Sequence, residues 1–215
     1  STNNLVGINS GTFASQPASV SLTSSAFPIE GSINQYEIVG FVPSVITVGT
    51  GGNYPNLTGN TGLFQDINKK AVSGNINVTI LSDLTEDGNH ALNEFFETGA
   101  GNYTLTIKPA DATMKTISGT VANGMIRFNG AERVNIDGSF SGSGKFLTFT
   151  NANTTNPTFT FINGASNNIL ENIIALGSST STTNGVIFIS TTNVATGNNN
   201  NIIRNSNLGN GTAGF

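Results

Sequence analysis

A short phrase recurs three times in the second half of the chain at nearly constant intervals. It begins at residues 134, 168 and 201, as V-N-I-D-G, N-I-L-E-N and N-I-I-R-N, so the two steps are 34 and 33 residues. Each copy has apolar, polar or charged, and Gly or Asn positions in the same order. A repeat of this length is typical of a solenoid, in which each repeat forms one coil that stacks on its neighbours. No other feature of the sequence restricts the fold as strongly.

The chain around these phrases reads as short β-strands, about ten residues apart, with Gly, Asn or Pro between them. Such spacing fits a β-sandwich, a barrel or a solenoid, and the repeat favours the solenoid because stacked coils bury matching inner side chains. We therefore predict an all-β, right-handed parallel β-helix (β-solenoid) over residues 46–215. The strands are expected near residue 46 and at 77–81, 103–108, 116–118, 125–128, 134–136, 146–150, 158–162, 169–170, 186–190 and 202–203.

Two other parts of the chain have a different character. Residues 1–45 are rich in Ser and Thr and predict a small N-terminal β segment or the tail of a preceding module, with strands at 20–22 and 36–39. Residues 63–72 predict a helix, because Leu63, Phe64, Ile67 and Ala71 fall on one face between two glycines. Residues 91–98 predict a further short helical or loop insert.

Alternation within the strands predicts which side chains form the core. Leu147 and Phe149 share one face of their strand and Phe159 and Phe161 share one face of theirs, so these four are expected inside. The threonines between them, Thr148, Thr150, Thr158 and Thr160, are expected outside. The 14 Phe and the absence of Trp suit a narrow core in which rings stack from coil to coil. Asn172 is expected to lie over Asn205 in a side-chain amide ladder.

Composition excludes several classes of function. Charged residues make up 9% of the chain, the net charge is −4 and the pI is about 4.8, which excludes the clustered basic surface of a nucleic-acid-binding protein. There is no Cys, so disulfides are excluded. No apolar run has the length of a membrane-spanning helix. We expect that a signal peptide has been removed or that this is an excised piece, and that further chain follows Phe215.

Residues 46–138 carry a recognisable succession of motifs. They run from I-T-V-G-T-G-G-N-Y-P-N-L-T through G-L-F-Q-D-I-N and N-V-T-I-L-S-D-L-T-E to G-N-Y-T-L-T-I-K-P and I-R-F-N-G-A-E-R-V-N-I-D-G. This succession resembles the right-handed parallel β-helix modules of large secreted and surface proteins of Bacteroidetes, which the type IX secretion system exports. In those modules, the Y-P-N-L segment and the helix after it cap the N-terminal end of the solenoid, and coils begin near N-V-T-I. Proteins of this kind are described as adhesin-like, and gliding-motility adhesins are among them.

The resemblance implies a cell-surface or extracellular location. It implies secretion-system components as partners during export and surface glycans as possible ligands afterwards. It does not decide between binding and catalysis, since β-helices also include polysaccharide lyases, glycoside hydrolases and phage tailspikes.

The most distinctive candidate site is a column of three charged residues in the repeat phrases. Asp137, Glu171 and Arg204 occupy the same place in successive copies, and adjacent coils lie about 4.8 Å apart. We interpret the column mainly as a solvated surface in which Arg204 offsets Glu171, with a cation or a sugar as a weaker alternative. Catalysis by two carboxylates is a third alternative. His90, the only histidine, stands in an acidic loop without further ligands at metal-binding spacing.

The sequence therefore predicts a non-catalytic adhesin or stalk module that presents a rigid polar face to glycans or surfaces. No catalytic residue, cofactor or metal ligand is predicted, and Asp137, Glu171 and Arg204 are the candidate surface contacts. One alternative is a β-helix polysaccharide lyase or glycoside hydrolase whose catalytic coils lie beyond residue 215. Another is a phage or virion fibre component.

Overall fold

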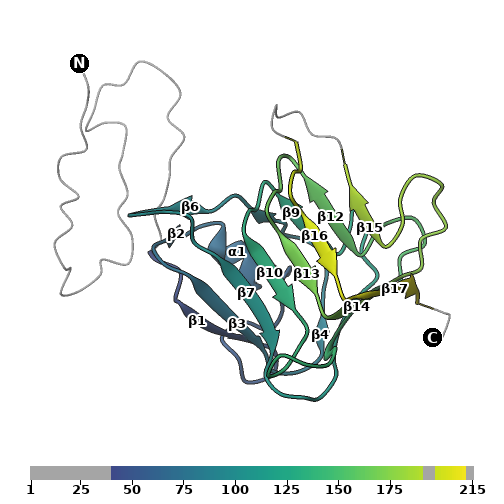
Figure 1. Cartoon of the computed structure of the whole chain (residues 1–215), viewed down its shortest axis with the longest axis horizontal. Coiled ribbons are helices and arrows are strands. Elements are labelled where there is room, and N and C mark those ends of the chain that lie inside the picture. The colour runs from purple at the N-terminus through teal and green to yellow at the C-terminus, as the bar shows by residue number, and fades with distance from the viewer. Residues whose placement is uncertain (1–39, 191–196, 212–215) are drawn as a thin grey trace. The chain divides into compact units, whose positions relative to one another are not determined.

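The structure is a computed structural model that describes residues 40–190 and 197–211 (Figure 1). Chain contacts divide the protein into residues 1–39 and residues 40–215, and the description below concerns the second unit. The strands predicted at 20–22 and 36–39 lie outside the described residues. Within the described ranges, no helix is both long and apolar enough to cross a membrane.

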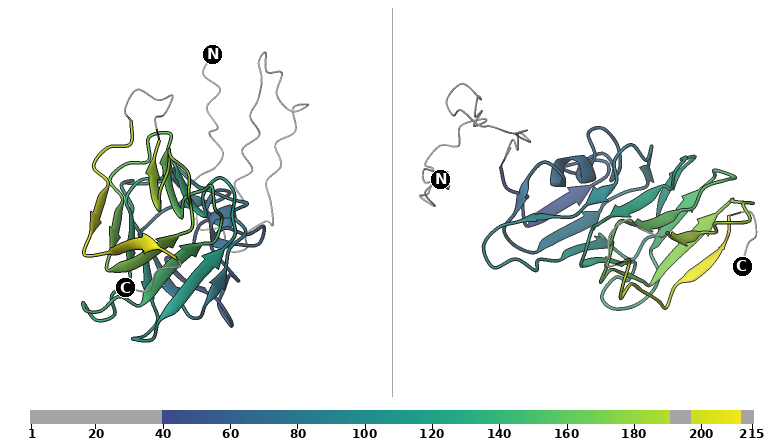
Figure 2. Two further views of the ribbon diagram at one scale, coloured as in Figure 1. Left: turned by 90° about the vertical axis from the view of Figure 1, so that its right-hand side faces the viewer. Right: turned by 90° about the horizontal axis from the view of Figure 1, so that it is seen from above.

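The described chain winds through three parallel sheets, visiting each in turn, which confirms the predicted β-solenoid (Figures 1 and 2). Sheet one stacks β1 (Val45–Val48), β3 (Ile76–Ile80), β7 (Leu105–Pro109), β10 (Val134–Asp137), β13 (Ile169–Glu171) and β16 (Ile202–Arg204). Sheet two stacks β4 (Leu84–Thr85), β8 (Lys115–Gly119), β11 (Leu147–Asn151), β14 (Ile173–Gly177) and β17 (Asn207–Asn210). Sheet three stacks β5 (Leu92–Asn93), β9 (Ile126–Asn129), β12 (Phe159–Ile162) and β15 (Ile187–Ile189).

The repeat phrase is the sheet-one strand of three successive coils together with the corner that follows it. Ile136, Leu170 and Ile203 are register partners on β10, β13 and β16. The last residue of each phrase forms the corner. Asn172 and Asn205 have φ values of 54° and 47°, in the left-handed region that Asn tolerates better than most residues. The matching corner residue directly after β10 is Gly138. A Cβ added to it would lie 2.2 Å from the carbonyl oxygen of Asn172, so only Gly fits there.

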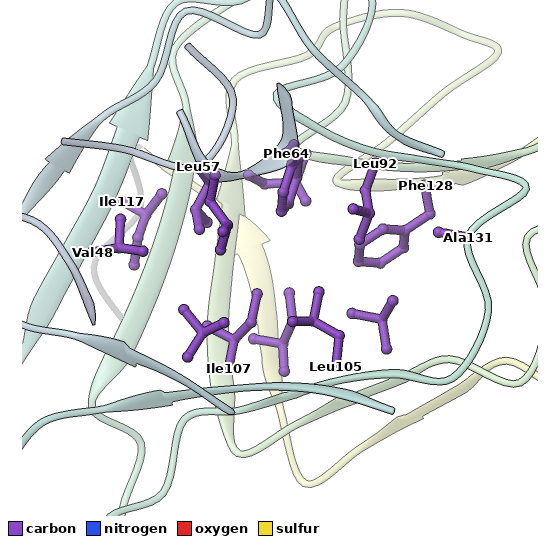
Figure 3. Close-up of a cluster of buried hydrophobic side chains, with 14 of the residues drawn as sticks. Val48, Leu57, Phe64, Leu92, Leu105, Ile107, Ile117, Phe128 and Ala131 are labelled. Carbon is purple, nitrogen blue, oxygen red and sulfur yellow. The ribbon is translucent and has the colours of Figure 1, made fainter. Parts of the chain in front are cut away.

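The inner side chains form one continuous apolar core, as the alternation predicted (Figure 3). Leu147, Phe149, Phe159 and Phe161 are all buried. The Phe128 and Phe161 rings, register partners on adjacent coils, meet edge to face with centroids 5.0 Å apart. This confirms ring stacking from coil to coil. Such a contact adds about 0.5–1.5 kcal/mol to the stabilisation from burial.

Asparagine ladders join the coils at their corners. The Nδ2 of Asn205 donates to Oδ1 of Asn172, which confirms the predicted pair, and Nδ2 of Asn172 donates 2.8 Å to Oδ1 of Asp137. A second ladder lies after sheet three, where Asn163 donates to Asn129 and Asn129 donates to Asn93. In both ladders the amide nitrogen donates toward the preceding coil, so the hydrogen bonds run in one direction along the stack.

A cap closes the N-terminal end of the solenoid. Helix α1 (Leu63–Ile67) buries Leu63 and Phe64, and the segment before it buries Leu57; Figure 3 shows Leu57 and Phe64 facing Ile107 and Leu105 across the core. The helix ends at Ile67, so the prediction of a helix over 63–72 was wrong at its C-terminal end. Its last residues instead form β2 (Ala71–Val72), which pairs with β6 (Phe96–Glu97).

Residues 91–98 are not a helix, because both of their apolar stretches belong to sheets. They form β5 and β6, and Leu92 is fully buried beneath its register partner Phe128. Pairing with neighbouring strands outweighs local helix propensity in this segment.

Two threonines predicted outside are buried. Thr158 precedes β12 and its hydroxyl donates to the carbonyl of Leu176, while Thr160 lies between Arg127 and Phe188 on the neighbouring coils. Large neighbours on both sides cover a side chain that alternation alone places in solvent. Besides β2, β5 and β6, three more strands were not predicted, namely β4, β14 and β17.

Candidate functional site

The predicted column exists as a row of register partners on the outer face of sheet one. Asp137 on β10 pairs with Glu171 on β13, and Glu171 pairs with Arg204 on β16. The three side chains therefore follow one another along the stacking direction, as the repeat phrase predicted. Their role as a contact surface stays a prediction.

Asp137 is enclosed by donors. Its Oδ1 accepts hydrogen bonds from the Ser139 backbone N–H at 2.9 Å and from Asn172 Nδ2 at 2.8 Å. Its Oδ2 lies 2.9 Å from Nζ of Lys108, which projects from β7 one coil earlier. Only 7% of the residue is exposed. Lys108 thus begins a charged row that continues through Asp137 and Glu171 to Arg204.

These contacts decide the protonation state of Asp137. Burial works against the charged form, but the hydrogen bonds from Asn172, Lys108 and Ser139 outweigh it and lower the pKa of Asp137 to about 2. The carboxylate is therefore ionised at neutral pH. A general acid of a glycoside hydrolase needs a raised pKa, so the surroundings of Asp137 do not suit that role.

Glu171 is held as closely on the next coil. Its Oε2 accepts two hydrogen bonds from the Arg204 guanidinium, with N–O distances of 2.7 and 2.8 Å. Its Oε1 accepts a hydrogen bond from Asn135 Nδ2 at 3.0 Å. The four carboxylate oxygens of Asp137 and Glu171 are thus all occupied by donors on the protein. A cation bound between the two carboxylates would have to displace Lys108 or Arg204.

Sequence reasoning missed Lys108 and Asn135 as members of this surface. The coils that carry β3, β7 and β10 are shorter than the later ones: Asn77, Thr106 and Asn135 are register partners spaced 29 residues apart. A search at 33 or 34 residues passes over Lys108, and it pairs Asn135 with Ile169 rather than with Glu171. Aligning Ile107-Lys108 with Ile136-Asp137 at the 29-residue step would have found Lys108.

Other titratable groups have structural partners. Glu86 is buried, which raises its pKa, and its carboxylate accepts hydrogen bonds from the backbone of Leu57 and Thr58 and from the Thr58 hydroxyl. Because Glu86 directly follows β4, these hydrogen bonds connect the cap segment to that strand. The Nε2 of His90 lies 3.1 Å from Oδ1 of Asn60, in the loop before α1.

The described surface offers little concavity. A shallow, open depression of about 360 Å³ lies on the turn after β1, lined by Gly49, Thr50, Gly51, Gly52, Pro55 and Asp83. It contains no member of the charged row. Within residues 40–190 and 197–211, no three His, Cys, Asp or Glu side chains are grouped so that they could hold a metal ion.

The sequence matches no protein-family model, and comparisons with curated proteins and with solved structures returned no match. The resemblance to Bacteroidetes β-helix modules therefore rests on the sequence motifs quoted above and stays a prediction.

Proposed function

We propose that this chain is a non-catalytic adhesin or stalk module of a secreted or cell-surface protein. Its coils act as a rigid support, and the outer face of sheet one contacts glycans or another polar surface. The resemblance of residues 46–138 to type IX secretion cargo supports export across the outer membrane, with secretion-system components as transient partners.

One observation carries the proposal: the coils share an unbroken apolar core while sheet one directs a row of fixed polar side chains outward. Inner positions from Ile46 to Ala175 are almost completely buried. Ion pairs join Lys108 to Asp137 and Arg204 to Glu171, and the pairing of β10 with β13 places the two ion pairs on adjacent coils. A rigid array of donors and acceptors binds a polar ligand with little loss of side-chain entropy.

The donors and acceptors suit a neutral or weakly charged glycan better than a highly charged ligand. The row contains two cations and two anions, so its charges offset one another. Lys108 and Arg204 remain about half exposed, at 50% and 58%, and still have donors that can reach a ligand. Thr106 and Asn135 lie beside them on the same face.

A glycan array probed with the purified chain tests this proposal. We expect binding that weakens about tenfold or more when Arg204 is replaced by Ala, since a charge-assisted hydrogen bond contributes about 1.5–3 kcal/mol. Thr148→Ala, on the outer face of sheet two, is the matched control and leaves binding unchanged. A chain that binds no glycan, or that binds equally well after both substitutions, would contradict the proposal.

The lyase or hydrolase alternative is separated by an activity test. Both the purified chain and the whole protein as produced by its source are incubated with acidic and neutral polysaccharides, and new reducing ends or unsaturated products are measured. We expect no cleavage. Cleavage that is lost in Asp137→Asn or Glu171→Gln, with unfolding curves that show both variants folded, would overturn the non-catalytic proposal.

The export route is tested in the producing bacterium. Fractionation and surface labelling of the whole protein are compared between the parent strain and a strain lacking a functional type IX system. We expect surface or medium localisation in the first and retention in the periplasm in the second. Equal localisation in both strains would contradict this route without affecting the binding test.

A further inference from the structure

The chain contains five Asn-Gly pairs, and the fold holds them differently. The backbone nitrogen of the residue after an Asn can attack the Asn side-chain amide, and glycine favours this reaction because it has no side chain to obstruct the approach. All five pairs lie within the described residues. Since the two reacting residues are the same in each pair, differences in reactivity among them come from the structure. The asparagines are Asn123, Asn129, Asn163, Asn184 and Asn210.

The pairs at 129 and 163 belong to the asparagine ladder after sheet three. Both asparagine side chains donate through Nδ2 to the asparagine of the preceding coil. The backbone nitrogens of the glycines that follow them also donate, over 2.9 Å to the carbonyl of Ile162 and over 3.0 Å to the side chain of Asn198. The amide group and the nitrogen that would have to meet are thus both fixed by hydrogen bonds.

The pairs at 184 and 210 are also restrained. The Asn184 side chain accepts a hydrogen bond from the Ser179 hydroxyl at 2.8 Å and donates to the Thr155 carbonyl at 3.0 Å. At the last pair, the nitrogen of Gly211 donates to the Gly177 carbonyl at 3.0 Å. In both pairs a reacting group must leave its partner before the two can approach each other.

The pair Asn123-Gly124 lacks these restraints. It lies in the turn between β8 and β9, where Asn123 is exposed and the two residues have positive φ values of 69° and 93°. The backbone N–H of Asn123 donates to the side chain of Asn156 at 2.9 Å, which anchors the turn. Among the described residues, neither the Asn123 side chain nor the Gly124 nitrogen has a hydrogen-bond partner. The two reacting groups are therefore free to meet.

The fold requires glycine after Asn123. A Cβ added to Gly124 would lie 2.3 Å from Oγ1 of Thr160. Thr160 is buried on β12, which pairs with β9 in sheet three. The close approach of these two coils therefore places an Asn-Gly pair in an exposed turn, and a larger residue at position 124 cannot remove it without disturbing the packing.

We propose that Asn123 is a site of spontaneous deamidation and reacts first among the five pairs of the folded chain. The Gly124 nitrogen bonds to Cγ of Asn123, the Cγ–Nδ2 bond breaks, and the side-chain nitrogen leaves as ammonia with the proton of the Gly124 N–H. The cyclic imide then adds water and opens at either carbonyl, giving aspartate or isoaspartate. Both products add one negative charge to the formal net charge of −4. Isoaspartate also lengthens the backbone of the turn by one carbon.

Peptide mapping by mass spectrometry, on purified chain incubated at neutral pH, measures the reaction at each pair. We expect deamidation at Asn123 to be about tenfold or more faster than at the other four, because hydrogen bonds must break before those pairs react. Urea-unfolded chain is the reference, in which the five pairs react at similar rates because the fold no longer distinguishes them. Asn123→Gln removes the early acidic variant from ion-exchange profiles, since Gln would have to close a larger ring.

A second substitution tests the physical cause. Ser179→Ala removes the hydroxyl that donates to Asn184, so deamidation at Asn184 is expected to accelerate while that at Asn123 stays unchanged. Circular dichroism verifies that each variant is folded. The proposal is overturned if another pair of the folded chain reacts first, if all five react at one rate, or if Asn123 stays intact while the unfolded chain reacts. An unchanged rate at Asn184 in Ser179→Ala would contradict hydrogen bonding as the cause of protection.

Discussion

The corner residue Asn172 performs two tasks that a substitution series can separate. It adopts a left-handed backbone, and its amide links the Asp137 carboxylate below it to Asn205 above it. Asn172→Gly keeps the backbone freedom and removes both hydrogen bonds. Asn172→Ala removes the same bonds and adds the cost of left-handed φ for a residue with a Cβ.

We therefore expect both variants to be less stable than the parent, by about 1–2 kcal/mol for Gly and about 1 kcal/mol more for Ala. Denaturant unfolding monitored by circular dichroism measures the difference. Equal losses for the two variants would show that backbone strain at the corner is unimportant. Asn123, a turn residue with φ of 69°, provides a control pair for the backbone effect, Asn123→Gly and Asn123→Ala.

Asp137 makes the stability of the chain depend on pH. Its pKa is lowered in the folded state to about 2, below the value near 4 expected in the unfolded chain. A lowered pKa means that the stabilisation is complete above about pH 4 and is lost as the pH falls toward 2. Removing the charge with Asp137→Asn costs about 1–2 kcal/mol at pH 7, after allowance for screening of the exposed Lys108 partner.

The expected signature is a gap between the parent and Asp137→Asn that closes as the pH falls from 4 to 2. Urea unfolding at pH 2, 3, 4 and 7 measures it. Glu94→Gln, at an exposed position, serves as the reference substitution. A gap of constant size across this range would mean that Asp137 acts through packing rather than charge.

At the scale of elements, the cap depends on one buried carboxylate. Glu86 accepts three hydrogen bonds from Leu57 and Thr58, so it fixes the segment before α1 to β4. Its pKa is raised by burial, which is the opposite shift to that of Asp137. The stability contributed by Glu86 is therefore greatest below its unfolded pKa near 4 and decreases as the pH rises through its folded value.

Glu86→Ala leaves those three donors without acceptors in a buried site. Each unsatisfied buried group costs about 1–3 kcal/mol, so a loss of about 3 kcal/mol or more is expected. Hydrogen exchange is expected to show faster exchange at residues 57–58 while the central coils remain protected. Glu94→Ala, at an exposed position, is the control. Unchanged protection of residues 57–58 would show that the cap is held by its apolar contacts alone.

The elements differ in how well the sequence predicted them, for physical reasons. Strands with strict alternation, such as β11, were predicted to within a residue because one face is buried and the other is not. Strand β14 was missed because it begins two residues after β13 ends, without a turn signal of the usual length. The helix over 63–72 was predicted too long because Ala71 falls on the apolar face of a helix but suits a strand equally well. In the structure it lies on β2 and pairs with Phe96 on β6.

The candidate column was predictable in position but not in chemistry. Its register followed from the repeat phrase, since Asp137, Glu171 and Arg204 share one offset. Its donors did not, because Lys108 belongs to a coil with a 29-residue step and Asn135 reaches diagonally across to Glu171. Local sequence does not encode a contact that depends on the lengths of the loops between coils.

At the scale of the whole solenoid, stability is expected to be distributed by nearest-neighbour contact. In such proteins each coil contacts only the coils beside it, so a coil with two neighbours contributes more than a coil with one. Ile136 and Ile203 provide a matched comparison. They occupy the same inner column, but Ile136 has β7 and β13 on its two sides and is fully buried, whereas Ile203 has β13 on one side and is 38% exposed.

The same substitution is therefore expected to have unequal effects. Ile136→Ala removes a side chain from a closed core and costs about 2–5 kcal/mol, while Ile203→Ala costs about 1 kcal/mol or less, because Ile203 is partly exposed. Denaturant unfolding of the purified chain, monitored by circular dichroism, measures both. Equal costs would contradict the expectation that a coil with two neighbours contributes more stability than a coil with one.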